Sequence, residues 1–270
     1  DFLDVPVVPG AALKAQRIGP TDVNGAMKRA CLLILLLLPS LAAAADVQPL
    51  ELHHELLLPA GVPDKVVALT LDACGGGFDA ELANFLIEHR IQATIFATRR
   101  WIRRNPDGLA LLKAHADLFD IENHGANHLP AVIGIDRSVY GLAGVADLKQ
   151  LEREVSGGAD AVKAATGTAP RWYRGATGEY DPEALKTIEA MGYKVAGFSL
   201  NADSGATLAK KQIVGRLKKV RSGDIIIAHL NKPESDTGKG MAEGLKLLLD
   251  QGFRFVKLND AEVRPLQKRS

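Results

Sequence analysis

The chain has 270 residues, 47% of them hydrophobic and 24% charged, and these ordinary values exclude a disordered, collagen-like or coiled-coil protein. Lysine and arginine number 33 and aspartate and glutamate 32, so the formal net charge of +1 provides no electrostatic basis for a nucleic-acid partner. The two cysteines, Cys31 and Cys74, are too few for a disulfide framework.

Residues 27–45 have the composition of a secretory signal peptide. Met27 is followed by two positive charges, then by an apolar run over 30–38, and then by small residues over 42–45. The apolar run is shorter than the roughly 20 residues that a membrane-spanning helix requires, so an N-terminal anchor is the less favoured alternative.

We expect cleavage near Ala45, which predicts a secreted or periplasmic protein with no stable membrane association once the signal is removed. Cys74 would then be the only cysteine of the mature chain. The segment 1–26 precedes the expected start at Met27 and is set apart as an upstream segment outside the fold. The mature chain is divided into an N-terminal lead-in, a barrel-forming region and a tail, at 46–63, 64–260 and 261–270.

Short apolar runs alternate with amphipathic segments along the mature chain. Seven runs rich in β-branched residues predict strands, at 66–74, 93–98, 118–124, 171–175, 194–200, 224–230 and 253–258. Five amphipathic segments predict helices, at 79–90, 147–167, 181–192, 207–220 and 241–252. The stretch 129–146, rich in glycine and alanine, predicts a long loop.

This alternation predicts a parallel sheet covered by helices. Seven strands in about 200 residues favour a single α/β domain built as a closed or nearly closed barrel, and the alternative is an open doubly wound sheet. No GxGxxG pattern follows the first predicted strand, so the sequence does not indicate a dinucleotide site.

Polar side chains gather where the predicted strands end, which is the edge of a parallel barrel where the loops converge and function resides. Five strand ends carry groups that bind metals, move protons or hold charge: Asp72 and Cys74; Glu122, Asn123, His124 and the nearby His128; Arg174; Asn201 and Asp203; His229 and Asn231. We therefore expect one site at this edge of the sheet.

Each of the main candidates also has a structural alternative. His124 and His128, four residues apart, suit zinc together with a carboxylate from another strand, and the alternative is a pair of hydrogen-bonded loop residues. His229 ends an almost wholly apolar strand. Its position favours the role of general acid, and the alternative is a histidine buried in the core. Asp72 has the alternative role of capping the next helix, and Arg174 that of a structural ion-pair partner.

These residues resemble, in this order, the motifs of the polysaccharide deacetylases (carbohydrate esterase family four, the NodB-homology domain) over roughly residues 64–260. The family's first motif, Thr-Phe-Asp-Asp, corresponds to Thr70–Ala73, and its second, His-Ser/Thr-x-x-His, to His124–His128. Its third motif, Arg-Pro-Pro-Tyr-Gly, corresponds to Arg174–Gly178.

The last two motifs of the family are matched less fully. The fifth, Leu-x-His, corresponds to Ile227–His229. The fourth, Asp-x-x-Asp-Trp, is only echoed by Asn201–Gly205, where the tryptophan is absent. Any single motif is a weak signal, but five in order, each at a predicted strand end, are fairly specific.

The resemblance implies a distorted (β/α)7 barrel that hydrolyses N-acetyl groups on a glycan by means of a metal-activated water. It implies that Asp72 is the general base, that Arg174 orients this base, and that His229 is the general acid. The backbone at Thr177 would help to hold the oxyanion. The expected partner molecule is therefore an N-acetylated glycan.

The resemblance further implies a divalent metal, expected to be zinc, on His124 and His128, with substrate contacts near Asn201 and Asp203.

Ala73 departs from the family, because the family's aspartate at that position is the third metal ligand and alanine cannot coordinate. The candidate replacements are Cys74, Asp79 and an additional water. A thiolate suits zinc. Against Cys74, neighbouring residues of a strand point to opposite faces, so it faces the site only if the chain turns at Ala73. The alternative is a small, buried, apolar cysteine.

Two other functions stay open at this point. A glycan-binding barrel that has lost catalysis is suggested by Ala73 and the weakened fourth motif, although the presence of both Asp72 and His229 argues against it. A hydrolase of a small non-peptide amide on the same fold is the other. The sequence does not indicate the oligomeric state.

Overall fold

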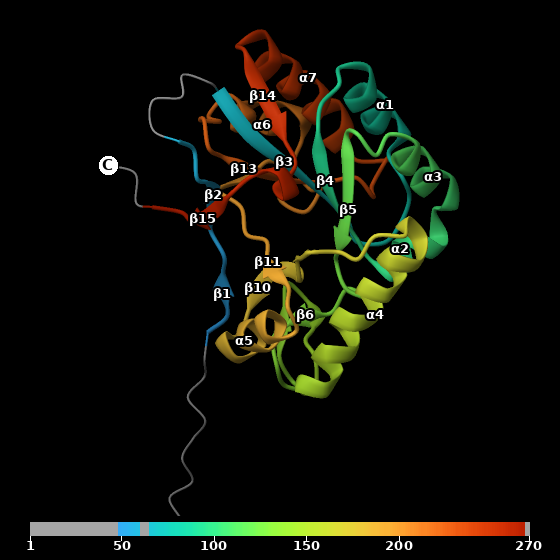
Figure 1. The fold of residues 1–270 in the computed structure, drawn as a ribbon. Helices are drawn as coiled ribbons and strands as arrows, with labels where there is room; N and C mark the ends of the chain where they lie inside the picture. Colours follow the sequence, from blue (N-terminus) through green and yellow to red (C-terminus); the bar gives the residue numbers. More distant parts are fainter. Residues whose placement is uncertain (1–47, 60–64, 268–270) are drawn as a thin grey trace, which may run out of the picture. The chain divides into compact units, whose positions relative to one another are not determined.

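The structure is a computed structural model that describes residues 48–59 and 65–267 (Figure 1). The chain divides into two units, Asp1–Ala45 and Asp46–Ser270, and every described residue belongs to the second. The expected upstream segment and signal peptide fall in the first unit and lie outside the described residues.

The main sheet has eight strands, and all of its strand pairs are parallel. The strands are β3 (Lys65–Ala73), β4 (Ala93–Ala97), β5 (Phe119–Asn123), β9 (Trp172–Tyr173), β11 (Lys194–Val195), β12 (Leu200–Asn201), β13 (Ile225–His229) and β14 (Phe253–Val256). β3 is the longest, and it pairs with β4, β13 and β14. It is therefore the central strand of the scaffold.

The strand order is that of a barrel. β3, β4, β5, β9 and β11 follow one another in space as they do in sequence, and the chain then returns through β12 and β13 to the other side of β3. In a doubly wound sheet the returning strand would begin next to β3 and the chain would move outward. Here β12 is at the edge and β13 is next to β3. This order confirms the distorted (β/α)7 barrel and excludes the doubly wound alternative.

The barrel is open between β11 and β12, and the lead-in lines this opening. A single strand over 194–200 was expected, but the backbone leaves the sheet at Gly197. The Gly197 N–H donates to His54 Nδ1 (3.1 Å), and the Phe198 N–H donates to the carbonyl of Leu52 (3.2 Å). A Cβ at Gly197 would lie 2.3 Å from the carbonyl oxygen of Leu52, so this close approach requires glycine.

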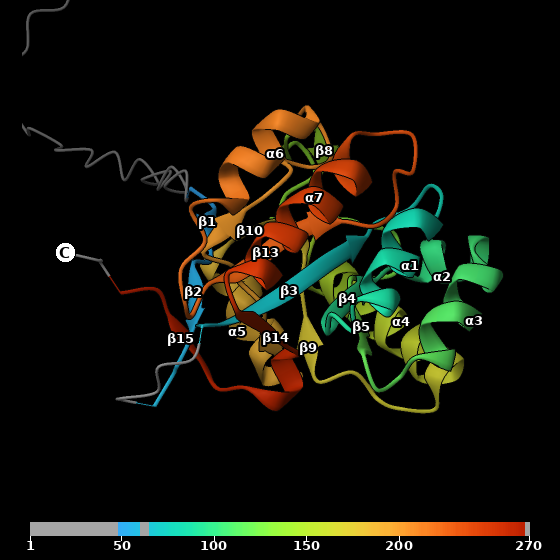
Figure 2. The ribbon, with the colours of Figure 1, turned by 90° about the horizontal axis from the view of Figure 1, so that it is seen from above.

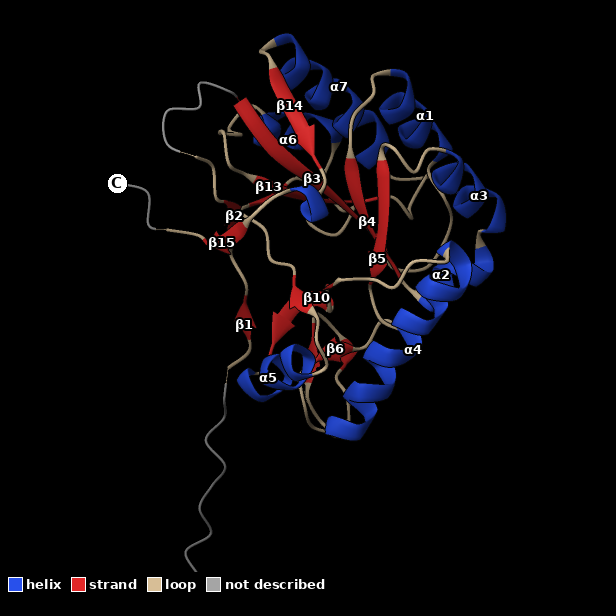
Figure 3. Cartoon of the chain, in the orientation of Figure 1, coloured by secondary structure: helices blue, strands red, loops and turns tan. Residues whose placement is uncertain are grey.

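Within the described residues, seven α-helices and one 3-10 helix accompany the strands (Figure 3). They are α1 (Ala80–Glu88), α2 (Arg99–Arg104), α3 (Pro106–Ala114), α4 (Leu148–Thr166), α5 (Pro182–Ala190), α6 (Lys210–Leu217), α7 (Thr237–Asp250) and η1 (Leu258–Asp260). Figure 2 shows α6 and α7 side by side, close to β3 and β13. None of the described helices combines the length and hydropathy that a membrane crossing requires.

α2 and α3 were not predicted from the sequence. α2 has six residues, four of them arginine, so it contains too few apolar positions to show a helical period. Its start is nevertheless fixed by a capping side chain, because Thr98 Oγ1 accepts a hydrogen bond from the Trp101 N–H at 3.0 Å. The predicted helices over 79–90 and 147–167 correspond to α1 and α4.

Seven short strands lie outside the main sheet among the described residues: β1 (Leu50–Glu51), β2 (His54–Leu56), β6 (Pro130–Ala131), β7 (Ser138–Val139), β8 (Leu142–Ala143), β10 (Ala176–Tyr180) and β15 (Val263–Pro265). β10 pairs with β1 and β6, and β2 pairs with β15, so the lead-in and the tail belong to the same folded unit as the barrel. The expected loop over 129–146 contains β6 and the β7–β8 hairpin. The hairpin turns at Tyr140 and Gly141, whose φ angles of 49° and 78° are those of a tight hairpin turn.

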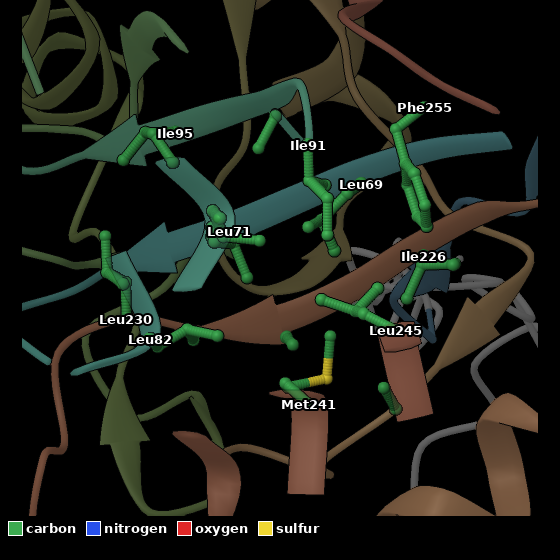
Figure 4. Close-up of a cluster of buried hydrophobic side chains, with 14 of the residues drawn as sticks. Leu69, Leu71, Leu82, Ile91, Ile95, Ile226, Leu230, Met241, Leu245 and Phe255 are labelled. Atoms are coloured by element: carbon green, nitrogen blue, oxygen red, sulfur yellow. The ribbon is translucent and has the colours of Figure 1, made fainter. Parts of the chain in front are cut away.

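The largest core lies between β3 and the helices. Figure 4 shows Leu69 and Leu71 of β3 among Leu82 of α1 and Met241 and Leu245 of α7, all of them 1% exposed or less. Each such side chain contributes about 1.5–3 kcal/mol through its burial. Because strand residues alternate between two faces, the positions between these leucines point to the barrel interior.

Candidate metal centre and active site

The carboxyl end of β3 places Asp72 against a buried arginine. Arg174, which follows β9, is fully buried, and its Nη1 donates to Asp72 Oδ1 and to Thr70 Oγ1, both at 2.9 Å. Its Nε and Nη2 donate to the carbonyl oxygens of Ala196 and Gly197, both at 3.3 Å. The guanidinium group is therefore fixed by both side-chain and backbone acceptors, and it presents one edge to Asp72.

Cys74, His124 and His128 form a compact set of metal-ligating side chains. One ligand atom from each lies within 4.8 Å of the other two. Cys74 Sγ is 3.4 Å from His124 Nε2, and the two imidazole rings are 5.0 Å apart between their centres. A thiolate and two imidazoles are a donor set that zinc accepts, with a fourth position left for water. The residues present thus fit a divalent metal.

The alternation of β3 explains why Cys74 belongs to this set. Ala73 is fully buried in the core on the helix side, together with Leu71. Asp72 lies on the opposite face, with Oδ2 3.8 Å from His124 Nε2, and Cys74 is on that face too. The two-residue period of a strand therefore brings Asp72 and Cys74 to the same imidazole without a turn at Ala73.

The tautomer of His124 is set by its second nitrogen. His124 Nδ1 lies 2.7 Å from the carbonyl oxygen of Arg174, which can only accept a hydrogen bond. The proton therefore sits on Nδ1, and Nε2 faces Cys74 and Asp72. An imidazole held in this way by a carbonyl is the usual arrangement of a metal-binding histidine.

The site concentrates negative charge around His124. Burial opposes ionisation of Asp72 and Cys74, but the positive charge of Arg174 holds the pKa of Asp72 below its usual value, and His124 holds the pKa of the Cys74 thiol well below its own. Burial lowers the pKa of His124, but the charges of Asp72 and Cys74 outweigh it and raise that pKa. The field that raises this pKa also favours a metal cation at the same position.

His229 lies at the end of β13 and has a carboxylate partner. Its Nδ1 is 3.0 Å and 3.1 Å from the two oxygens of Asp203, and its backbone N–H donates to Asp203 Oδ2 at 2.9 Å. The hydroxyl of Thr237 donates to the same oxygen at 3.1 Å. Burial lowers the pKa of His229, but Asp203 together with the Cys74 thiol raises it well above its usual value. Asp203 is fully buried, and both of its carboxylate oxygens are occupied by contacts with His229 and Thr237.

The other predicted residues of the third and fourth motifs hold turns of the chain. Thr177 has a φ of 71°, an uncommon value for a β-branched residue, and its buried hydroxyl has no hydrogen-bond partner within the described part of the chain. Asn201 Oδ1 accepts a hydrogen bond from the Ser204 N–H at 2.8 Å. Nearby, the Gly175 N–H donates to the hydroxyl of Tyr180 at 2.8 Å.

Two further polar residues from the predicted strand ends, Glu122 and Asn123, form hydrogen bonds with the backbone. Glu122 Oε2 accepts hydrogen bonds from the N–H groups of Arg171 (2.7 Å) and Trp172 (2.8 Å), which ties β5 to the start of β9. Asn123 Nδ2 donates to the carbonyl of α4 residue Val155 at 2.8 Å.

Asp79 caps α1 by accepting from the Leu82 N–H at 2.9 Å, so it lies outside the cluster of ligands.

A cavity of about 310 Å³ opens beside the cluster. Its lining combines two of the candidate ligands with a glycine loop, two cations and one anion: Cys74, Gly75, Gly76, Gly77, Arg100, His128, Asn231, Lys232 and Glu234. Asn231 holds the glycine loop in the wall of this cavity. Its side-chain Nδ2 donates to the carbonyl of Gly75 at 2.6 Å, and its backbone carbonyl accepts from the Gly77 N–H at 3.0 Å. The size suits a small part of a larger ligand.

Fold and site together define an open parallel barrel that gathers carboxylate, imidazole, thiol and guanidinium side chains at the carboxyl ends of its strands. The sequence profile of the polysaccharide deacetylase family matches residues 60–196, and the chain belongs to this family.

Relatives of known structure share the fold. The Bc1960 peptidoglycan N-acetylglucosamine deacetylase superposes with a TM-score of 0.60 and 19% identity over 74% of this chain and 89% of that one. BA3943, a CE4 family pseudoenzyme from Bacillus anthracis, superposes with a TM-score of 0.58 and 19% identity over 73% of this chain and 65% of that one. An uncharacterized 30.6 kDa protein of Geobacillus stearothermophilus is 25% identical over 205 residues, which cover 73% of this chain and 70% of that protein.

Proposed function

We propose that this chain is a metal-dependent deacetylase that hydrolyses N-acetyl groups on a glycan. The observation that carries the proposal is the meeting of three units at one end of the sheet. These are Asp72 held by Arg174, the cluster of Cys74 and two histidines, and His229 held by Asp203. Binding alone requires neither a base nor an acid, whereas amide hydrolysis requires both.

The metal of the proposal is zinc, held by Cys74, His124 and His128. Thiolate sulfur and imidazole nitrogen favour zinc over magnesium or calcium, which prefer oxygen ligands. Cys74 takes the place that Ala73 cannot fill, because it lies on the same face of β3 as Asp72.

Each proton of the reaction has a side chain to move it. Zinc bound at this cluster would polarise the acetyl carbonyl and lower the pKa of a water molecule. Asp72 accepts a proton from the attacking water, and Arg174 keeps this carboxylate ionised and oriented. His229 donates a proton to the nitrogen of the leaving amine, and Asp203 holds the imidazole in place. Water is thus added across the C–N bond to give acetate and a free amine.

The backbone N–H of Thr177 is the proposed donor to the oxyanion. Support comes from its neighbourhood, where a positive φ at Thr177 and the bond from the Gly175 N–H to Tyr180 hold an unusual turn beside Arg174. Preorganised backbone donors of this kind stabilise the charge that develops on the carbonyl oxygen.

The test is the release of acetate from N-acetylglucosamine oligomers and from peptidoglycan by the zinc-loaded protein, with and without a chelator. We expect release that the chelator abolishes and that added zinc restores. No release from any acetylated glycan, with zinc measured in the protein, would favour a glycan-binding barrel without catalysis. That alternative gains weight from the likeness in fold to BA3943, a pseudoenzyme. Release from small amides alone would favour the third function, a small-amide hydrolase.

We also propose that the chain is exported, with cleavage near Ala45, on the basis of the signal-like residues 27–45. N-terminal sequencing of the protein from a periplasmic or secreted fraction should find a start near Asp46. An intact Met27 in a cytoplasmic fraction would contradict export.

A further inference from the structure

The loop that carries His128 is held from one side by α4. This loop, residues 125–129, follows β5, and α4 approaches it closely at Gly157 and Gly158. A Cβ at Gly158 would lie 2.5 Å from the carbonyl carbon of Gly125. Two adjacent glycines lower the stability of a helix at its middle. Their presence here is explained by the close approach of α4 to the loop, which leaves no room for a Cβ.

Glu154, one turn before the two glycines, directs its carboxylate into the loop. The residue is only 2% exposed. Its Oε1 accepts hydrogen bonds from the backbone N–H groups of Asn127 (2.8 Å) and Leu129 (3.2 Å), and its Oε2 accepts one from Asn127 Nδ2 (3.2 Å). One carboxylate oxygen therefore accepts from the backbone N–H groups of both residues that flank His128.

His128 has a backbone conformation that needs such support. Its φ is 64°, in the left-handed region that residues other than glycine rarely adopt. The bond from the Leu129 N–H to Glu154 fixes the peptide group that follows His128, and the bond from Arg100 to the Asn127 carbonyl fixes the one that precedes it. In this conformation the His128 ring lies 5.0 Å from the ring of His124 and reaches the cluster.

Asn127 links the carboxylate to two arginines of α2. Arg99 Nη2 donates to Asn127 Oδ1 and Arg100 Nη1 donates to the carbonyl of Asn127, both at 3.1 Å. The backbone N–H and the side-chain amide nitrogen of the same residue bind Glu154. Asn127 thus lies between a buried anion and two cations, and this arrangement offsets the cost of burying the carboxylate.

Gly125 makes room for Glu154. A Cβ at Gly125 would lie 2.5 Å from Glu154 Oε1, and the φ of Gly125 is 84°. The glycine of this chain is therefore matched to a carboxylate that reaches the loop from α4.

We propose that Glu154 is a positioning residue of the metal centre, which holds His128 in the conformation in which its imidazole joins Cys74 and His124. The inference rests on the metal site of the proposed function. Glu154 contacts neither the cavity nor the candidate ligands directly, so it acts through the loop.

The experiment measures the zinc affinity of the purified protein by competition with a chromophoric chelator. Glu154→Gln removes the charge of the carboxylate, and Glu152→Gln makes the same change at an exposed position of the same helix. We expect Glu154→Gln to weaken zinc binding roughly 10-fold to 100-fold, as is typical of residues that orient metal ligands. Glu152→Gln should bind zinc as wild type does.

A His128→Ala background separates positioning from general damage. If Glu154 acts through His128, adding Glu154→Gln to His128→Ala changes zinc affinity no further. Equal losses in both backgrounds, or wild-type affinity in Glu154→Gln, overturn this inference alone. Wild-type protein that does not bind zinc overturns the proposed metal site as well.

Should Glu154→Gln fail to fold, Asn127→Ala replaces it, because this substitution removes the side-chain bonds to Glu154 and Arg99 at an exposed residue and leaves the backbone bonds in place. It should weaken zinc binding in the wild-type background and have no further effect in His128→Ala. Unchanged affinity in Asn127→Ala counts against the inference.

Discussion

Two histidines of the site, one directly after β5 and one at the end of β13, have different surroundings. His124 Nδ1 meets a neutral carbonyl, that of Arg174, at 2.7 Å, and its other nitrogen faces the cluster. His229 Nδ1 meets the carboxylate of Asp203 at 3.0 Å. A carbonyl fixes a tautomer without adding charge, whereas a carboxylate stabilises the protonated ring.

Under the proposed function, these surroundings suit the two histidines to two different tasks. In the proposed metal half, the carbonyl that holds His124 Nδ1 leaves the lone pair of Nε2 available to a cation. In the proposed acid half, the carboxylate of Asp203 stabilises the protonated ring of His229, which can then donate a proton. We therefore expect that substitutions can disable the metal half and the acid half separately.

The largest expected effect separates the two histidines. His124→Ala should lose most of its zinc and its turnover, because the ligand is removed. His229→Ala should lower turnover by roughly 10²-fold to 10⁴-fold, the contribution of a general acid, while its zinc content stays at the wild-type level. Metal analysis and acetate release on both variants check this. Loss of zinc in His229→Ala would show that the halves are not distinct.

Asp72→Asn affects the group that lies between the halves. The amide keeps the shape of the side chain but cannot accept the proton of the attacking water, so turnover should fall by roughly 10²-fold to 10⁴-fold. Zinc should remain bound, because the three proposed ligands are intact. A variant that keeps more than half of the wild-type rate of acetate release would rule out Asp72 as the base.

Asp203→Asn weakens the acid half without removing the imidazole. It should lose only part of the general-acid contribution, roughly 10-fold to 100-fold in turnover. Zinc affinity should be unchanged. The matched control is Asp236→Asn, at an exposed aspartate that precedes α7. If Asp203→Asn behaves like this control in steady-state assays, Asp203 does not support His229.

Cys74→Ser tests the unusual ligand of the metal half. Replacing a thiolate by a hydroxyl should weaken zinc binding by roughly tenfold or more, which corresponds to about 1.4 kcal/mol. The cobalt-substituted protein offers a second readout, because a sulfur ligand gives a near-ultraviolet charge-transfer band that the serine variant should lack. Equal zinc affinities for the two proteins would exclude Cys74 as a ligand.

Asp79→Asn has the smallest expected effect, because it changes neither the metal half nor the acid half of the site. Asp79 caps α1 and asparagine caps helices about as well as aspartate, so the free energy of unfolding should fall by less than about 0.5 kcal/mol, with zinc binding and turnover unchanged. Chemical denaturation checks the stability. A clear loss of zinc would return Asp79 to the set of ligand candidates.

The barrel could be predicted from the sequence because its central strands are long and apolar. β13 contains three consecutive isoleucines, and β3 contains two valines followed by two leucines at alternate positions, so periodicity and composition agree with the fold. The opposite side of the barrel could not be predicted. β11 and β12 have two residues each, and their arrangement depends on contacts of Gly197 with Leu52, which lies far away in the sequence.

The positions of the candidate site residues could also be predicted in part. Strand ends indicated Asp72, His124 and His229, because in a parallel barrel they share one edge. The role of Glu154 could not be predicted, because it sits in mid-helix and only the folded chain brings its carboxylate to the loop. The two glycines that follow it in α4 were the one local signal of a close contact.

The pairing of β2 with β15 has a consequence for how the protein is made. Arg264 Nε donates to Glu55 at 3.0 Å across a separation of 209 residues, so β2 cannot pair until β15 has been made. Contacts of such long range form late and slow folding. The segment beside the barrel opening, which includes His54, can therefore be secured only after residues 263–265 have been synthesised. Until then this segment lacks its partner strand.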